Sequence, residues 1–365
     1  MTNGTPPRRP GPASFARVDP RPRLSEPEND FRPPLWARGP NAQTLLGRVL
    51  RPRRSPDLHR ERWTTSDGDF LDLDFTPDTD PASPLVLVLH GLEGSSRRGY
   101  VLAALAAARR RGAAGVALNF RGCSGQPNLG TRAYHSGETA DPVFVLERLR
   151  ERFPGRPFGA VGFSLGGNVL LKLLGESGPG ARRWLDAAVA ISVPFDLAAG
   201  AAQLETTRWG RLYSRHFLRS LKGKVRDRAR ILREKVDIGR TLDSRTLREF
   251  DDALTAPLHG FRDADHYYEA SSAAAHLENV RVPTLLIQSM DDPFLPERAV
   301  PAEHIRGNPF LTCRFSARGG HVGFVCGTPW SPRFWAEDEA ISFLMERFAR
   351  PNGSEGAESG SIPHD

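Results

Sequence analysis

A glycine-flanked serine is the strongest chemical signal in this chain of 365 residues. Residues 162–167 read GFSLGG, and they stand between an apolar run typical of a buried strand and a stretch with helical spacing. A G-x-S-x-G string in this setting is typical of a nucleophile elbow, a strained turn that exposes the serine hydroxyl at the edge of a sheet. The amide of Leu165, at the start of the helix, can donate to a developing oxyanion. The string therefore predicts nucleophilic catalysis by Ser164.

A second glycine-rich string predicts the other half of an oxyanion hole. Residues 90–96 read HGLEGSS and follow the apolar run 85–89. In hydrolases built around a nucleophile elbow, the loop after this strand supplies a second oxyanion amide, which here would be that of Leu92. His90 precedes the nucleophile, whereas the usual order along such chains is serine, acid, histidine. We therefore expect a structural role for His90.

A serine hydroxyl is a poor nucleophile until a base removes its proton, and one of the ten histidines lies in a suitable loop. Residues 319–324 read GGHVGF and follow the predicted strand 312–315. Glycines on both sides permit a loop that projects the imidazole of His321 towards Ser164. Imidazole titrates near neutrality, which suits proton transfer. His321 is the predicted base.

The acid that fixes the tautomer of this base should follow a late strand. Residues 290–296 read MDDPFLP and come directly after the apolar run 284–289. Asp291 and Asp292 are adjacent, so their side chains point in different directions and only one should face the histidine. The residues alone leave both open.

The elements that must position these groups alternate between strands and helices. Strands are predicted over 62–65, 70–75, 85–89, 115–119, 158–163, 187–193, 284–289 and 312–315, and helices over 100–110, 138–153, 165–174 and 333–350. The first two strands flank Asp67-Gly68, a hairpin turn signal. Such alternation indicates an α/β fold with a mostly parallel sheet covered by helices on both sides.

One segment, residues 198–279, interrupts this alternation with no convincing strand. Trp209, Leu212, Tyr213, Phe217 and Leu221 recur at helical spacing, and residues 208–248 carry fourteen basic and four acidic side chains, a net charge of +10. We expect a helical lid insertion over the functional edge of the sheet, with its apolar face on an acyl pocket. The alternatives are an ordinary helical layer of the core and a helix that lies on an anionic membrane.

Composition bounds the remaining possibilities. Residues 1–30, a Pro/Arg-rich arm, and 351–365 are predicted to be disordered, which leaves 31–197 and 280–350 for the core. No apolar run approaches the roughly 18 residues that a spanning helix needs, and no secretory signal is recognisable. Three scattered cysteines suggest a reducing compartment without a zinc site, so we expect a cytoplasmic protein.

The charge balance is basic, with a net charge of +7 and a pI near 9.7. Only four residues are lysine, so almost all of the basic charge is arginine, typical of a solvated arginine-rich surface. No helix-turn-helix, zinc motif or aromatic-basic RNA motif accompanies it, so we do not expect nucleic-acid binding.

Six strings together resemble the YheT-like branch of the α/β-hydrolases, whose animal members are the abhydrolase-domain esterases. They are HGLEGSS at 90–96, NFRGCSGQPN at 119–128, YHSGET at 134–139, GFSLGGN at 162–168, DDPFLP at 291–296 and GGHVGF at 319–324. The resemblance spans roughly residues 33–350. It accounts for Cys123 as loop architecture, and we expect Arg121 in the same string to brace the active-site loops through a carboxylate.

The resemblance implies an α/β-hydrolase fold and a Ser-Asp-His triad that cleaves carboxylic esters, such as acylglycerols or other acyl esters. The family's spacing between the acid and a following proline favours Asp292, with Asp291 as the fallback. It implies no metal and no organic cofactor. Two alternatives remain: acyl transfer to an alcohol on the same triad, and a non-catalytic lipid-binding homologue. Peripheral, electrostatic contact with an anionic membrane is a further expectation.

Overall fold

The computed structural model describes residues 31–51, 57–78 and 80–349 of the chain. The two predicted disordered segments, 1–30 and 351–365, lie outside the described residues.

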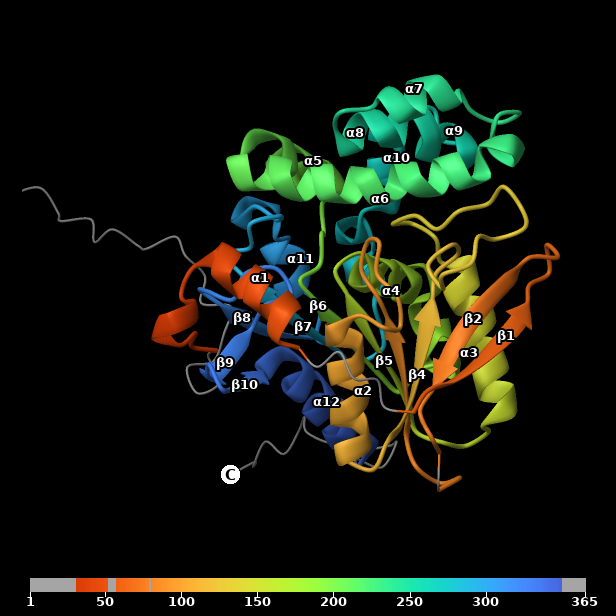
Figure 1. Cartoon of the computed structure of the whole chain (residues 1–365). Coiled ribbons are helices and arrows are strands. Elements are labelled where there is room, and N and C mark those ends of the chain that lie inside the picture. Colours follow the sequence, from red (N-terminus) through yellow and green to blue (C-terminus); the bar gives the residue numbers. More distant parts are fainter. Residues whose placement is uncertain (1–30, 52–56, 79, 350–365) are drawn as a thin grey trace, which may run out of the picture.

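A twisted sheet forms the centre of the molecule (Figure 1). In the described part of the chain its eight strands are β1 (His59–Thr64), β2 (Phe70–Phe75), β3 (Leu85–Leu89), β4 (Ala114–Asn119), β5 (Phe158–Phe163), β6 (Ala187–Ile191), β7 (Thr284–Ser289) and β8 (Leu311–Ser316). Their spatial order is β1-β2-β4-β3-β5-β6-β7-β8. β1 and β2 form the predicted hairpin and β2 pairs antiparallel with β4, whereas β3 to β8 are parallel. The predicted mostly parallel α/β sheet is confirmed.

Helices cover both faces of this sheet. The main ones are α2 (Gly99–Arg110), α3 (Ala140–Arg152), α4 (Leu165–Ser177) and α12 (Trp335–Phe348), with shorter pieces η3 (Gly178–Arg183), η6 (Glu297–Ala299) and α11 (Ala302–Arg306). Side chains of a strand alternate between faces, so Val86 and Val88 of β3 pack with α2 and α12, whereas Leu85 and Leu87 pack with α3 and α4. This two-sided burial explains why the central strands are continuous apolar runs.

The order of the strands reverses between β3 and β5. The chain passes from β3 to β4 on one side and then returns to β5 on the other side of β3. In open α/β sheets, ligands bind in the crevice beyond the carboxyl ends of the strands at such a reversal. The strings at 90–96 and 162–167 leave β3 and β5 at this point.

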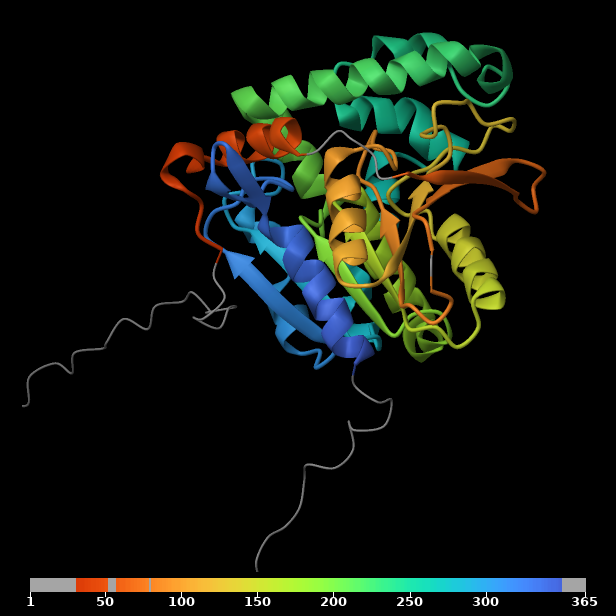
Figure 2. The same cartoon turned by 60° about the horizontal axis from the view of Figure 1, so that its bottom comes forward.

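Between β6 and β7 the chain forms a helical layer, the insertion, corresponding to the predicted 198–279 segment. Its elements are α5 (Leu197–Thr206), α6 (Arg208–Leu232), α7 (Ile238–Asp243), α8 (Leu247–Phe250), the π-helical turn η4 (Asp251–Thr255), α9 (Ala256–Leu258), α10 (Ala264–Ser271) and η5 (Ala273–Asn279). The long helix α6 crosses above the carboxyl edge of the sheet (Figures 1 and 2). The last piece, η5, packs on α4 in the core instead.

Two local features differ from the sequence predictions. The helix expected over 333–350 begins at Trp335, because Ser331–Phe334 form strand β10, which pairs with β9 (Val325–Thr328). Pro332 disfavours helical geometry at the residue before it, which is consistent with this later start. Near the N-terminus, η2 (Leu35–Ala37) and α1 (Pro40–Leu50) were not predicted.

Candidate active site

Ser164 occupies the predicted turn between β5 and α4. Its backbone has φ 52° and ψ −119°, a conformation that residues other than glycine rarely adopt. The turn requires close packing of its neighbours: a Cβ at Gly166 would lie 2.5 Å from the carbonyl oxygen of Leu89. The strain holds the hydroxyl at the carboxyl edge of the sheet, as in a nucleophile elbow.

His321 reaches Ser164 from the loop after β8. Its Nε2 lies 2.9 Å from the Ser164 Oγ, and its Nδ1 lies 2.8 Å from Oδ2 of Asp292. A carboxylate can only accept, so Nδ1 carries the proton and Nε2 is free to accept from the serine. The imidazole stacks on the ring of Phe294 at 4.2 Å between centroids, which fixes its plane.

The two adjacent carboxylates have separate partners. Asp292 is fully buried and faces the histidine, and its other oxygen accepts from the backbone N–H of Phe294 at 2.8 Å. Asp291 turns away and accepts from the backbone N–H groups of Gly319 and Gly320, both at 2.9 Å. The structure thus brings Asp292, rather than Asp291, next to the histidine, while Asp291 supports the loop that carries it.

Leu92 lies in a tight turn beside the nucleophile. The turn is closed by a hydrogen bond from the Gly94 N–H to the Gly91 carbonyl at 2.9 Å, and a Cβ on Gly91 would lie 3.1 Å from that of Ser164. Leu165 is the first residue of α4, where backbone N–H groups have no partner within the helix. The residues that carry the two predicted oxyanion amides therefore lie close to Ser164.

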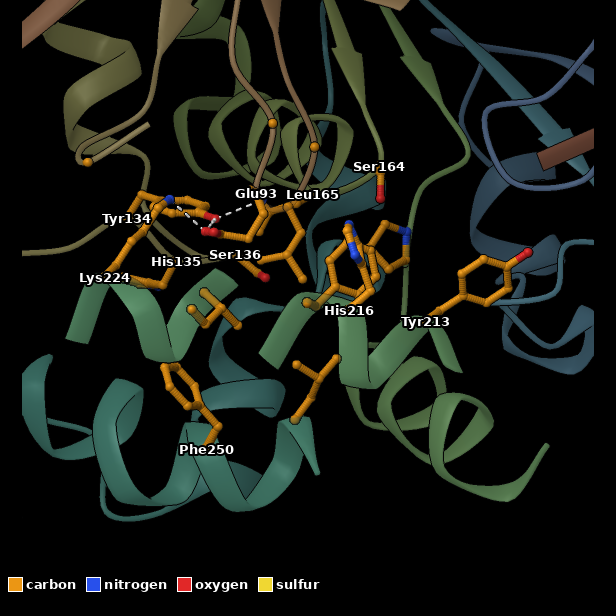
Figure 3. A pocket seen from close by; sticks show the side chains of 18 of the residues that line it. Glu93, Tyr134, His135, Ser136, Ser164, Leu165, Tyr213, His216, Lys224 and Phe250 are labelled. Carbon is orange, nitrogen blue, oxygen red and sulfur yellow. Dashed lines mark hydrogen bonds and ion pairs between the residues drawn. The ribbon is translucent and has the colours of Figure 1, made fainter. Parts of the chain in front are cut away.

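A cavity of about 840 Å³ opens above these groups, between the sheet and the insertion. The loops of the core form its floor and include Ser164, Leu165 and His321. The roof is largely apolar and comes from the insertion, with Leu204, Tyr213, Phe217, Leu221, Val225, Leu232, Leu247, Phe250, Leu254 and Leu258. Figure 3 shows side chains of both layers facing this space. A cavity of this size suits a small organic molecule with an apolar part.

The prediction that the apolar face of α6 lies over a pocket is correct for only part of the helix. Tyr213, Phe217 and Leu221 line the cavity, but Trp209 and Leu212 are 47% and 53% exposed and are not among the described residues that line it. The prediction that Trp209 contributes to an acyl pocket is therefore wrong. It lies in the first turn of α6, and helical spacing alone does not show which turns of a helix face a cavity.

The sequence analysis missed the support that α1 gives to the histidine loop. The Thr44 hydroxyl accepts from the backbone N–H of His321 at 2.9 Å. Fully buried Gln43 donates to the carbonyls of Ala37 and Val325 and accepts from the N–H of Val325. His321 and Val325 are far from α1 in the chain, so local patterns carry no signal for these contacts.

His90 has the structural role expected of it. Its Nδ1 donates to the Gly91 carbonyl and its Nε2 accepts from the N–H of Phe120. Burial lowers the pKa of His90 to about 4, so it stays neutral and keeps this pattern.

The neighbouring string at 119–128 also behaves as expected. Arg121 makes two hydrogen bonds to the buried carboxylate of Asp141, at 2.7 and 2.8 Å. Burial raises the pKa of the Cys123 thiol to about 11, so it is protonated and unsuited to nucleophilic attack.

Two further observations concern metal binding and membrane-spanning helices. Within the described ranges no three His, Cys, Asp or Glu side chains are grouped so as to hold a metal ion. Nor does any helix of those residues combine the length and apolar character needed to cross a bilayer.

Comparison with known proteins agrees with the geometry. The α/β hydrolase fold family matches residues 84–325. The YheT protein of Escherichia coli (strain K12) is 38% identical over 309 residues, which cover 83% of this chain and 89% of that protein. Phospholipase ABHD3 of Mus musculus is 31% identical, with 81% of this chain and 74% of the relative covered.

A yeast relative and a solved structure extend this similarity. Monoacylglycerol lipase of Saccharomyces cerevisiae is 32% identical over 74% of this chain and 62% of its own length. The esterase Pf2001 of Pyrococcus furiosus has the same fold, with a TM-score of 0.52, 17% identity, and coverage of 81% of this chain and 98% of that one. The chain therefore belongs to the α/β-hydrolase family, in the branch that includes YheT.

Proposed function

We propose that this protein is a serine hydrolase that cleaves carboxylic esters through an acyl-enzyme on Ser164. The observation that carries the proposal is the continuous hydrogen-bonded chain from Ser164 through His321 to Asp292 on the floor of a mostly apolar cavity. Serine, imidazole and carboxylate in this order form the arrangement that activates a hydroxyl for acyl transfer.

In the proposed reaction, the Ser164 oxygen attacks the ester carbonyl carbon while Nε2 of His321 takes its proton. The amides of Leu92 and Leu165 stabilise the negative charge that forms on the carbonyl oxygen. The tetrahedral intermediate collapses, the bond to the alcohol oxygen breaks, and His321 returns the proton to the leaving alcohol. Water then attacks the acyl-enzyme by the same route and releases the acid. Asp292 keeps the imidazole in the required tautomer throughout.

The apolar roof supports an acyl ester, or an acylglycerol, as the substrate class. Its side chains form a cluster that also includes Phe294 and Leu295 of the loop after β7, so the insertion would act as a lid over the acyl chain. Relatives named as a monoacylglycerol lipase and a phospholipase are consistent with lipid-like esters.

A fluorophosphonate probe and a panel of p-nitrophenyl esters and monoacylglycerols of graded chain length test the proposal. We expect covalent labelling of Ser164 and ester hydrolysis, both lost in Ser164→Ala. Labelling that persists in the alanine variant would refute the assignment. Absence of turnover in a labelled, folded protein would favour the lipid-binding alternative. Formation of a new ester when an alcohol is added would favour acyl transfer.

We also propose peripheral contact with an anionic membrane beside the cavity. Trp209 and Leu212 of α6 and Leu45 and Val49 of α1 are exposed, and a contact between Arg48 and His216 links the two helices. α6 carries many arginines, and each basic group near an anionic surface contributes about 1 kcal/mol.

Co-sedimentation with liposomes that contain phosphatidylserine tests this contact. Salt screens electrostatic attraction, so we expect binding in low salt that is lost in high salt. Binding that survives high salt would indicate apolar insertion instead, and no binding in low salt would exclude the contact.

A further inference from the structure

The oxyanion turn contains a buried acid that the proposed reaction does not use. Glu93 directly follows Leu92, its side chain is 5% exposed, and its backbone has a positive φ of 52°. A glutamate in this left-handed conformation is strained and persists only when its surroundings hold it there. The conformation belongs to the turn from Gly91 to Gly94, which carries Leu92 at the wall of the cavity.

Tyr134 is the first group that holds this turn. Its hydroxyl accepts from the Glu93 backbone N–H at 2.9 Å and donates to the Glu93 carboxylate at 2.7 Å. The phenol thereby joins both ends of the same residue. Its ring in turn stacks on Phe120 with an angle of 7° between the planes. This part of the support belongs to the core.

The insertion holds the Glu93 carboxylate, whereas Arg98 of the core also donates to the Glu93 carbonyl at 2.6 Å. Nζ of Lys224 on α6 lies 2.6 Å from Oε1 of Glu93, and the hydroxyl of Ser220, one turn earlier on α6, donates to the other carboxylate oxygen. Figure 3 shows Lys224, Glu93 and Tyr134 joined in one network beside the cavity. Burial lowers the pKa of Lys224, but its charged and hydrogen-bonded neighbours outweigh this and leave it raised, so the ammonium persists.

We infer that Glu93 is a positioning residue for the Leu92 oxyanion amide. Lys224 of α6 holds the Glu93 carboxylate in place. This inference rests on the proposed function. Removal of the Lys224 ammonium would leave a buried carboxylate without its ion-pair partner, and such a charge relaxes towards water. The strained turn then loses the support that Lys224 gives to the Glu93 carboxylate, and the Leu92 N–H moves out of line with the oxyanion. The oxyanion hole is therefore complete only while α6 is docked on the core, which couples the roof to the chemistry.

The test compares Lys224→Met with Lys222→Met. Lys222 lies on the same helix, but it bonds to the Ser244 carbonyl within the insertion, so it controls for general loosening of α6. Complete loss of one oxyanion donor lowers turnover by about 10²–10³-fold. For a displaced donor we expect Lys224→Met to lower kcat on a p-nitrophenyl acetate substrate about tenfold, with KM unchanged within about twofold.

A transition-state mimic separates positioning from folding. A trifluoromethyl ketone adds to Ser164 and places an oxyanion in the hole, so its affinity should fall by the same factor as kcat in Lys224→Met and stay unchanged in Lys222→Met. Lys224→Arg should restore both. If Lys224→Met unfolds, Ser220→Ala, which removes one hydroxyl, should give a smaller loss of the same kind.

Four outcomes are decisive. Equal losses in both lysine variants, or wild-type kcat in a folded Lys224→Met protein, would overturn the inference while leaving the proposed function intact. Loss of thermal stability with unchanged affinity for the ketone would also overturn it. Wild-type protein without Ser164-dependent ester hydrolysis would instead refute the proposed function.

Discussion

The floor and the roof of the cavity are held in different ways. On the floor, polar bonds fix each group: His321 is held by Asp292 through its ring and by Thr44 through its backbone N–H. The roof is held mainly by apolar packing, in a cluster that includes Leu218, Val225 and Phe250. Hydrogen bonds are directional, whereas apolar contacts are not. The floor is thus suited to chemistry, which tolerates little displacement, and the roof to accommodating substrates of different shape.

The largest difference between floor and roof should appear at the nucleophile. Ser164→Ala removes the attacking oxygen and should lower turnover by roughly 10⁴–10⁶-fold, whereas no single roof substitution should approach this loss. Ester hydrolysis and fluorophosphonate labelling measure it directly. A residual rate within tenfold of wild type would place the chemistry elsewhere.

A second prediction separates the two carboxylates of the floor. Asp292→Asn replaces an acceptor with an amide that can hold the wrong tautomer of His321, so kcat should fall by about 10⁴-fold. Asp291→Asn keeps an oxygen that can accept from Gly319 and Gly320. Its loss should stay within about tenfold, since only loop support changes. Steady-state kinetics on folded variants decide between them, and the reverse ranking would move the acid to Asp291.

The apolar side chains of the roof should affect substrate choice rather than catalytic power. Leu221→Ala removes an apolar group from the cavity and should lower kcat/KM for a long-chain ester by about tenfold, with an acetyl ester nearly unaffected. Leu212→Ala is the matched control, because this leucine lies on the same helix but is half-exposed. Kinetics over a series of chain lengths measure the effect. Equal losses on short and long esters would remove Leu221 from an acyl-binding role.

The smallest effect is expected where floor and roof meet. His135 of the core and His259 of the insertion lie with their rings 4.3 Å apart. Burial is the main cause that lowers the pKa of His135 to about 3 and that of His259 to about 4. The imidazole pKa in the unfolded chain is about 6.5, so the folded state binds fewer protons. Stability is therefore fully present above about pH 6.5 and is lost as the pH falls towards 4.

Thermal unfolding at pH 7 and pH 5 tests this prediction. The drop in Tm should be smaller in His259→Gln than in wild type, by about 2 °C. The groups that also act on this pair are Glu138, Lys172 and Arg132, and all three are retained in both proteins. An identical drop in Tm in both proteins would show that His259 does not contribute to the pH dependence of stability in this range.

Much of the floor follows from local sequence. The apolar runs that become β3 and β5 and the string around Ser164 are each short, and the conformations they need are set by neighbouring residues. The glycine-rich string around His321 is similarly local. Gly320 illustrates this, since it has a φ of +61°, a backbone conformation that favours glycine. The sequence could therefore predict these loops and the α/β fold without knowledge of the distant residues that contact them.

The choice between Asp291 and Asp292 could not be made from the residues alone. Both lie in the same loop, and their roles depend on which one faces the imidazole and which one faces the Gly319 and Gly320 amides. The same limit explains the error at Trp209, since helical spacing defines a face of α6 but not where the core beneath it ends.

The amino-acid sequence by itself determined the strands of the main sheet and the helices that cover it, the nucleophile candidate and the histidine candidate, because periodicity and glycine-dependent turns are encoded over a few residues. Tertiary structure alone decided the contacts across long separations. Thr44 meets His321 across 277 positions, and Lys224 meets Glu93 across 131. Such pairs leave no periodic trace in one sequence, because they depend on where whole elements dock, and docking is set by the packing of the complete core and insertion.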